Sequence, residues 1–418
     1  MQMDKKTSAA TDPERISLQK TILFSAITAI LLLLFAELCT RGGLYLLSSF
    51  YHSKYNPIDV STVSDSDRTR IQAFIAHKTE YMIHHPVLGW SLAANSGAAN
   101  DQSGSPDQLR TNTLGIRSLR EYTPKPLAGR IRVAAFGDSF THGDGVANDQ
   151  TWEAKLETLD SRFEVLNFGV PGYGPDQAYL RYQLEGKQVN PHIVIIGVMS
   201  ENIYRIVNRY RSFYMPRTGL PLAKPRFVME GRTMHLLPNP LPTLASYQQL
   251  LDNPGEVLPR LGVNDFHYMT AYTAGQFDFL ATVRLSKMAL SRYSEREQIK
   301  NLDGTYNTNS EAFILLVELL SNFYDEVIRD GAVPVVLVFP NTTDMNRLLR
   351  GKPVAYAPLT SSLKHKGMTT IDGMSAFESA LNDESLRELI KGHYTARGNE
   401  VIAEHLLTAL PWASVASE

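Results

Sequence analysis

The apolar residues of the chain form one long run near the N-terminus and a series of short runs further along. The long run covers residues 22–40 and contains a single charged side chain, that of Glu37. About 20 mostly apolar residues are needed to cross a bilayer, so this run is long enough to span one. We therefore predict a transmembrane segment over residues 21–47, preceded by a polar tail at residues 1–20.

Basic residues are concentrated before this run, at Lys5, Lys6, Arg15 and Lys20. The positive-inside rule then places the N-terminus in the cytoplasm and about 370 residues outside. A cleaved signal peptide would need small residues at a cleavage site, and the sequence after the run offers a poor one. A buried core helix is the weaker alternative. The prediction is an uncleaved signal anchor in a bacterial inner membrane, single-pass, with a periplasmic or other extracytoplasmic domain.

Five short apolar runs further along the chain lack polar alternation, which is typical of strands buried on both faces. They cover residues 131–136, 163–168, 192–198, 333–339 and 368–372. Segments with helical spacing separate them, at residues 150–160, 176–188, 311–329 and 375–390. This alternation predicts the α/β class, with a doubly wound parallel sheet of about five strands. Ligands of such sheets bind beyond the carboxyl ends of the strands.

Two segments fall outside this rhythm. Residues 48–105 are expected to form a stalk or cover, with a helix over residues 64–80 followed by a loop rich in Ser, Ala, Asn and Gly. Residues 106–418 are expected to form the α/β domain, enlarged by an insertion at about 203–310. That insertion holds 8 of the 22 prolines, and its 13 Lys or Arg against 8 Asp or Glu give a local charge of +5.

The overall composition excludes several classes of protein. With 41 Lys or Arg against 43 Asp or Glu, the net charge of −2 excludes a globally basic nucleic-acid binder and an acidic disordered chain. The single cysteine, Cys39, excludes a disulfide scaffold, a multi-cysteine zinc site and an iron–sulfur cluster. His84 and His85 lack partners at metal-ligand spacing. We therefore expect no metal and no cofactor.

Candidate chemistry follows the strand runs. Ser139 stands between the first strand and a helix start, where its hydroxyl is exposed beside backbone N–H groups. His393 stands before the last helix and could reach across the strand ends, and a Ser–His hydrogen bond makes a hydroxyl nucleophilic. Gly172 allows close backbone approach to a ligand, and the Asn202 amide could donate to an oxyanion. Taken alone, each segment is better explained as an ordinary turn, a helix cap or, for His393, a surface histidine.

Together these four segments resemble the SGNH/GDSL hydrolase superfamily. Ser139 lies in GDSFT, Gly172 in NFGVPGYG, Asn202 in MSEN and His393 in GHYTARGN. Residues 112–117, NTLGIR, resemble a membrane-anchored branch that is often linked to cell-surface polysaccharides, with alginate-acetylation proteins as more distant relatives. The resemblance implies a flavodoxin-like three-layer fold. It also implies Ser139 as nucleophile, His393 as base, and oxyanion donors at Gly172 and Asn202.

The sequence departs from the family pattern beside the histidine. The family usually has an aspartate two or three residues earlier, where this chain has Lys391 and Ile390. A backbone carbonyl could orient the imidazole instead, or an acid from elsewhere could do so, with Asp372 at the end of the last strand as the nearest candidate. Loss of catalysis is the third alternative. In the third block, Ile203 stands where the family usually has Asp.

Basic and aromatic residues alternate at residues 209–214 of the insertion. Rings stack on sugar faces and arginines pair with carboxylates, so Arg209 and Arg211 are candidate substrate-binding residues for an anionic glycan. A packed loop with solvated charges is an equally good interpretation. Nucleic acid would also suit the pattern, but the predicted compartment argues against it.

These observations predict a membrane-anchored serine esterase or O-acyltransferase, with acetyl as the expected acyl group. Its substrate would be a carbohydrate ester of the cell envelope or of an exported polysaccharide, and proteins of polysaccharide export would be its partners. One alternative is a lipase or thioesterase acting near the bilayer. The other is a catalytically inactive, glycan-binding scaffold component.

Overall fold

The computed structural model describes residues 17–51, 62–98, 109–215, 219–231, 233–272 and 275–414. Most of the predicted cytoplasmic tail and part of the predicted loop after residue 91 lie outside these ranges. The chain divides into two compact units. One comprises residues 1–58 and 274–290, and the other comprises residues 59–273 and 291–418.

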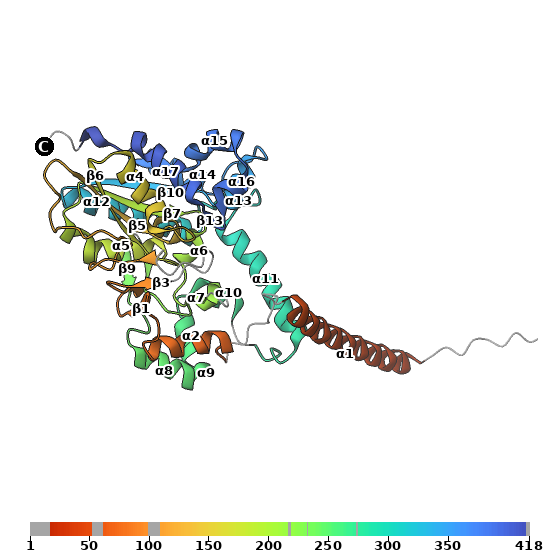
Figure 1. Cartoon of the computed structure of the whole chain (residues 1–418). Coiled ribbons are helices and arrows are strands. Elements are labelled where there is room, and N and C mark those ends of the chain that lie inside the picture. Colours follow the sequence, from red (N-terminus) through yellow and green to blue (C-terminus); the bar gives the residue numbers. More distant parts are fainter. Residues whose placement is uncertain are drawn as a thin grey trace, which may run out of the picture. The chain divides into compact units, whose positions relative to one another are not determined.

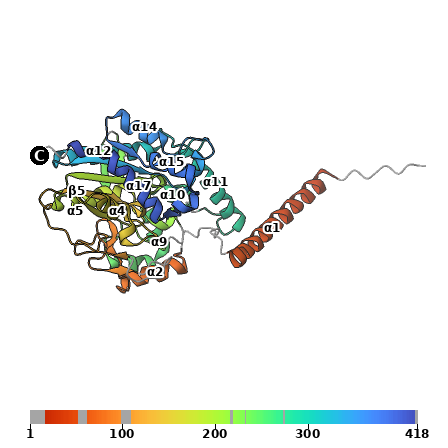
Figure 2. The same cartoon turned by 45° about the horizontal axis from the view of Figure 1, so that its top comes forward.

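The first unit is built on the long helix α1 (Leu18–Tyr51), which Figure 2 shows as one unbroken helix. Its residues 18–46 have a mean hydropathy of 2.5, so by length and composition this helix can cross a membrane. The carboxylate of Glu37 accepts hydrogen bonds from Arg41 and from the backbone N–H groups of Ala281 and Thr282, at 2.6, 2.8 and 3.0 Å. Glu37 therefore caps the start of α11 (Ala281–Ile299).

The second unit contains a five-stranded parallel sheet, which confirms the predicted fold class (Figure 1). The order across the sheet is β11-β10-β7-β5-β6, the flavodoxin-like order. Apart from partly buried residues at the strand starts and in the last strand, all side chains are buried, which explains the apolar runs without alternation. The strands are β5 (Ile131–Gly137), β6 (Phe163–Gly169), β7 (Ile193–Met199), β10 (Val333–Phe339) and β11 (Thr370–Asp372).

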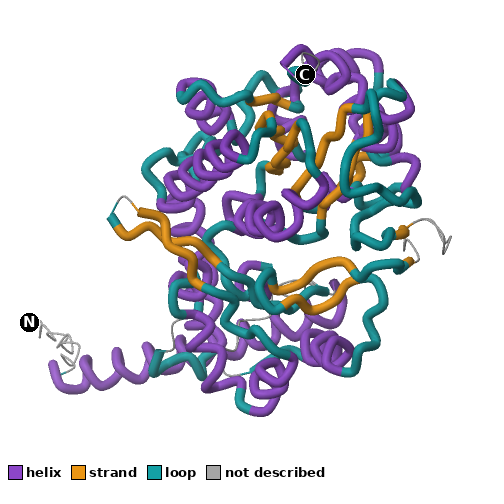
Figure 3. Tube along the Cα trace, turned by 90° about the vertical axis from the view of Figure 1, so that its left-hand side faces the viewer, coloured by secondary structure: helices purple, strands orange, loops and turns teal. Residues whose placement is uncertain are grey.

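Helices cover both faces of this sheet, and Figure 3 shows the orange strands between purple helices. On one face α5 (Pro175–Glu185) packs on β5 and β7, α12 (Glu311–Arg329) on β10, and α14 (Ala357–His365) on β11. On the other face α4 (Trp152–Leu159) packs on β6 and on α17 (Ala396–Ala409), which also contacts α15 (Met374–Asp383). α13 (Thr342–Leu348) follows β10.

The helix predicted over residues 375–390 is two helices. α15 ends at Asp383, because Glu384 adopts an extended conformation with φ −120° and ψ 149°. Ser385 then caps the start of the short α16 (Leu386–Leu389), and its backbone N–H and hydroxyl both donate to the Glu388 carboxylate, at 2.6 and 2.8 Å. Helical spacing does not reveal this break, because strong helix formers stand on both sides of it.

The segment before the sheet packs within the same unit. It contains α2 (Asp65–Ile75), which ends before residue 80, and the hairpin of β1 (Met82–His85) with β2 (Gly89–Leu92). β3 (Gly97–Ala98) pairs with β4 (Leu109–Arg110). The buried Trp90 donates from its ring nitrogen to the carbonyl of Pro171 at 3.0 Å, and the Tyr173 hydroxyl donates to the Trp90 carbonyl at 2.6 Å. The hairpin thus supports the loop that carries Gly172.

The insertion after β7 folds into short elements around buried polar groups. The carboxylate of Asp265 accepts hydrogen bonds from the side chain of Asn208 at 2.9 Å and from the backbone N–H of Arg209 at 2.5 Å. Lys224 forms a buried ion pair with Asp176 of α5. The elements are α6 (Asn202–Arg205), α7 (Arg211–Tyr214), the hairpin of β8 (Arg226–Glu230) with β9 (Thr233–Leu237), α8 (Leu244–Asp252), α9 (Pro254–Gly262) and α10 (Phe266–Ala271).

Candidate active site

Ser139 stands at the first position of the short helix α3 (Ser139–His142), directly after β5. The side chain of Asp138 caps this helix by accepting the N–H of Phe140 at 2.9 Å. The end of β6 passes so close to α3 that a Cβ on Gly169 would lie 2.2 Å from the backbone nitrogen of His142. Glycine at this position is therefore a packing requirement, and it fixes the turn that presents Ser139 at the carboxyl edge of the sheet.

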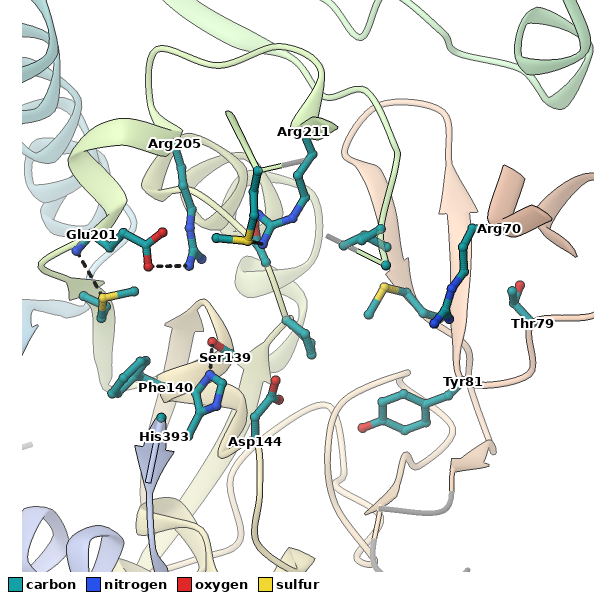
Figure 4. A pocket seen from close by; sticks show the side chains of 18 of the residues that line it. Arg70, Thr79, Tyr81, Ser139, Phe140, Asp144, Glu201, Arg205, Arg211 and His393 are labelled. Carbon is teal, nitrogen blue, oxygen red and sulfur yellow. Dashed lines mark hydrogen bonds and ion pairs between the residues drawn. The ribbon is translucent and has the colours of Figure 1, made fainter. Parts of the chain in front are cut away.

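His393 lies on a two-residue strand, β13 (His393–Tyr394), which pairs antiparallel with β12 (Ile390–Lys391). Gly392 makes the turn between them with a φ of +81°. The imidazole Nε2 lies 2.8 Å from the Ser139 hydroxyl oxygen, and its ring packs against Phe140 with centroids 5.1 Å apart (Figure 4). The structure thus brings Ser139 and His393 together.

Gly172 and Asn202 are placed differently with respect to this pair. Gly172 lines the same cavity as Ser139 and adopts a φ of +83°. Asn202 is buried at the start of α6, where its Oδ1 accepts the N–H of Met199 and its Nδ2 donates to Asp138, both at 2.9 Å. Arg205 donates to the same oxygen of Asp138 at 3.1 Å. Asn202 therefore holds Asp138, the residue that caps α3, through one of its amide hydrogens.

A cavity of about 1110 Å³ opens over Ser139 and His393. Three arginines line it, all labelled in Figure 4: Arg70 of α2, from the segment before the sheet, and Arg205 of α6 and Arg211 of α7, from the insertion. Glu201 pairs with Arg205 at 3.5 Å and accepts the hydroxyl of Tyr214. Burial, together with the charge of Arg205, lowers the pKa of Arg211 to about 10, so this guanidinium stays protonated at neutral pH.

Two predicted site residues hold other partners. The guanidinium of Arg209 donates to the carbonyls of Val263 and Pro238 at 3.2 and 2.9 Å, so it fastens the insertion and does not line the cavity. Asp372 accepts the hydroxyl of Tyr356 at 2.7 Å and the N–H of Met374 at 3.0 Å. The structure shows no hydrogen bond between Asp372 and His393: β11 is the edge strand, and β10 and β7 lie between it and β5.

The sequence reasoning missed a second polar group beside the serine. The hydroxyl of Tyr81 lies 2.6 Å from Nε2 of His142, and Nδ1 of His142 lies 2.5 Å from the carboxylate of Asp144. Asp144 lines the cavity together with Ser139 and His393. The sequence feature that indicates this group is an acidic residue, Asp144, five positions after Ser139 and directly after Gly143, which ends α3.

Comparisons with known proteins find no matching family model and no matching curated protein. The solved structures that match include a putative lipolytic protein of the G-D-S-L family from Desulfitobacterium hafniense, at 15% identity and a TM-score of 0.35, covering 67% of this chain and 100% of that one. An acetyl-xylooligosaccharide esterase from Geobacillus matches at 11% identity and a TM-score of 0.36, covering 68% of this chain and 97% of that one. The first name is that of the family which the four sequence blocks resemble. At such identities and TM-scores the case for a function rests on the geometry of the site.

Proposed function

We propose that this chain is a serine ester hydrolase in which Ser139 is the nucleophile and His393 the general base. The observation that carries the proposal is the 2.8 Å contact between the imidazole Nε2 and the serine hydroxyl at the carboxyl edge of the sheet. A serine hydroxyl is a weak nucleophile near neutral pH unless an adjacent base removes its proton.

The reaction would proceed in two steps. The Ser139 oxygen attacks the ester carbonyl while its proton passes to His393, and the imidazolium then returns this proton to the departing alcohol. Water, activated by His393, hydrolyses the acyl-enzyme and releases the acid. The proposed oxyanion donors are the backbone N–H groups of Ser139 and Gly172 and the side-chain amide of Asn202.

The proposed substrate is a short acyl ester, with acetyl as the expected group, on an anionic glycan. A cavity of about 1110 Å³ has room for sugar units beyond the ester itself. Arg70 and Arg211 supply guanidinium groups, which pair well with the carboxylates of acidic sugars, whereas Arg205 is already paired with Asp138 and Glu201. Water as the acceptor makes the enzyme an esterase, and a sugar hydroxyl as the acceptor makes it an O-acyltransferase.

The proposed location is the outer face of a bacterial inner membrane, with α1 as the anchor. The support is the length and apolar composition of α1 and the basic residues that precede it. A domain held at this place would meet polysaccharides of the envelope or polysaccharides in export, and components of their export would be its neighbours.

Ester hydrolysis is tested with the full chain in detergent on p-nitrophenyl acetate. We expect Ser139→Ala to lower kcat by roughly 10³-fold or more, as in other serine hydrolases. Ser321→Ala is the matched control, because this serine lies on α12 and donates only to the carbonyl of Val317. Equal rates for wild type and Ser139→Ala would refute the proposal. A preference for octanoyl over acetyl esters would favour a lipase.

The anionic glycan is tested with a matched pair of arginines on α2. Arg70 lines the cavity, whereas Arg68 donates to the carbonyl of Leu251 outside it. Arg70→Gln should raise KM for an acetylated uronic-acid oligosaccharide about 10-fold or more and leave p-nitrophenyl acetate unaffected, since a hydrogen bond to a charged group contributes about 1.5–3 kcal/mol. Arg68→Gln should change neither. An unchanged KM in Arg70→Gln would contradict this choice of substrate.

A further inference from the structure

The hairpin that carries His393 contains no acid to orient the imidazole. Ile390 is buried, and Lys391 is exposed on the strand that pairs with His393. Asp372 is engaged with Tyr356 at the sheet edge. A general base of a serine hydrolase works best when a negative group fixes its ring and stabilises the imidazolium that forms. Another side chain must supply this charge if the pair is fully active.

Asp144 is placed to supply it. Gly143 ends α3 in the left-handed conformation, with φ 80° and ψ 46°, and turns the chain back over the serine, so that the N–H of Asp144 bonds to the Ser139 carbonyl at 3.0 Å. The Asp144 side chain is 29% exposed and lines the cavity with His393. Figure 4 shows its carboxylate beside the imidazole ring, and the two side chains interact through charge.

Two neighbours fix the protonation and orientation of Asp144. Burial lowers the pKa of His142, so its imidazole is neutral at pH 7, and burial raises the pKa of the Tyr81 hydroxyl, which keeps its proton. The Tyr81 hydroxyl then donates to Nε2 of His142, and its Nδ1–H donates to Asp144. Burial by itself raises the pKa of Asp144. The contact with His142 and the nearby positive groups outweigh burial and hold the pKa below its usual value, so the carboxylate is ionised.

The loop that carries Asp144 is held by a buried arginine from the NTLGIR segment. Arg117 donates to the carbonyl of His142 at 2.7 Å and also to the carbonyls of Gly143 and Val146. Its side chain is almost fully buried, so these bonds are shielded from water. Three carbonyl contacts on one short loop restrict where Asp144 can move. The NTLGIR segment thus supports the site through this loop.

We propose that Asp144 is the positioning residue of His393, in place of the acid that the family pattern has just before the histidine. The inference rests on the proposed function of Ser139 and His393. The carboxylate holds Nδ1–H of His393 toward itself and stabilises the imidazolium while Ser139 is acylated. Hydrogen bonds of this kind are often long in unliganded sites and shorten when substrate binds.

The other charged side chains that line this cavity have partners of their own or come from the segment before the sheet. Glu201 is bound to Arg205 and Tyr214, and Arg211 donates to the carbonyl of Gly172 at 2.8 Å. The first segment contributes Arg70, Lys78 and Glu80 to the cavity wall. Asp144 is the acid whose charge acts on both His142 and His393.

The test compares kcat and KM of Asp144→Asn, Asp144→Glu and the control Asp372→Asn on p-nitrophenyl acetate. We expect Asp144→Asn to lower kcat about 100-fold or more, because loss of the orienting acid costs about 10⁴-fold in a chymotrypsin-type triad. Its KM should stay close to that of the wild type, because the carboxylate acts on the base and does not bind the substrate. Asp144→Glu should restore part of the rate, and Asp372→Asn should change neither quantity.

A measurement without turnover separates this inference from the proposed function. In a Ser139→Ala background, the Nδ1–H proton resonance of His393 is recorded by NMR with and without Asp144→Asn. An upfield shift of this resonance without the Asp144 carboxylate supports the inference even if no ester is cleaved. An unchanged resonance and an unchanged kcat would overturn it. If Asp144→Asn does not fold, Tyr81→Phe takes its place, because it removes the hydroxyl that bonds to His142, the partner of Asp144. Tyr81→Phe should move both readouts in the same direction by a smaller amount, and no movement would count against the inference.

Discussion

Replacing Asn202 by alanine separates two roles that this side chain can have. In one role, its amide donates to the oxyanion that forms when Ser139 attacks. In the other, it only fastens Asp138, to which it donates at 2.9 Å, and thereby the turn that presents Ser139. The amide carries two hydrogens, so the bond to Asp138 leaves one for an oxyanion. We expect both roles.

The two roles have different magnitudes and different readouts. Loss of an oxyanion donor costs about 2.7–4 kcal/mol of transition-state stabilisation, which is about 10²–10³-fold in kcat with little change in KM. Loss of a buried hydrogen bond to a carboxylate costs about 1.5–3 kcal/mol of folding free energy. Arg205 still pairs with Asp138 at 3.1 Å, so the serine turn should persist in the variant.

Asn208→Ala is the matched control for this experiment. Asn208 is also a buried asparagine of the insertion, and its amide donates to the carboxylate of Asp265 at 2.9 Å, away from the cavity. Both variants should melt at lower temperature by a similar amount, whereas only Asn202→Ala should lose kcat on p-nitrophenyl acetate. If kcat of Asn202→Ala stayed within threefold of wild type while the melting temperature fell, Asn202 would be a structural residue and the oxyanion assignment would fail.

Three further changes test the packing that supports the site. Burial raises the pKa of Glu153 well above its usual range, so the buried Glu153 side chain destabilises the folded state more as pH rises above about 4.5. Glu153→Gln should therefore melt at a higher temperature than wild type at pH 8 and show little difference at pH 4.5. Lys224→Met leaves Asp176 buried without its partner and should cost about 3–5 kcal/mol in denaturant unfolding, and adding Asp176→Leu should recover most of it. Gly169→Ala should yield little soluble or active protein, because its Cβ would meet the backbone of α3.

The sheet could be predicted because its strands are buried on both faces. Residues 333–339 lack polar alternation, and the predicted bounds coincide with those of β10. The hairpin of β1 with β2 could not be predicted in this way. Its strands have four residues each and contain His84, His85 and Ser91, so they carry no apolar run. What stabilises them is Trp90, which packs beside Tyr173 far along the chain.

Site residues could be predicted where they follow a strand, but not where the packing of distant segments decides their position. Ser139 and His393 could be paired because the carboxyl ends of parallel strands meet at one edge. Arg209 and Arg211 have the same sequence surroundings, yet one binds carbonyls inside the insertion and the other reaches the cavity. Only the fold of the insertion distinguishes them. The place of Asp144 depends equally on Tyr81, which lies 63 positions before it in the numbering.

The walls of the cavity and its chemistry come from different parts of the unit. The sheet and its C-terminal hairpin supply Ser139, His393 and Gly172, whereas α2 supplies Arg70 and the insertion supplies Arg211. A small activated ester needs only the first set, because it has no groups that extend to the arginines. A glycan ester would use both sets. Changes in α2 or the insertion that spare Asn202 and Arg205 should therefore alter the choice of glycan while leaving hydrolysis of p-nitrophenyl acetate intact, which separates specificity from catalysis in this fold.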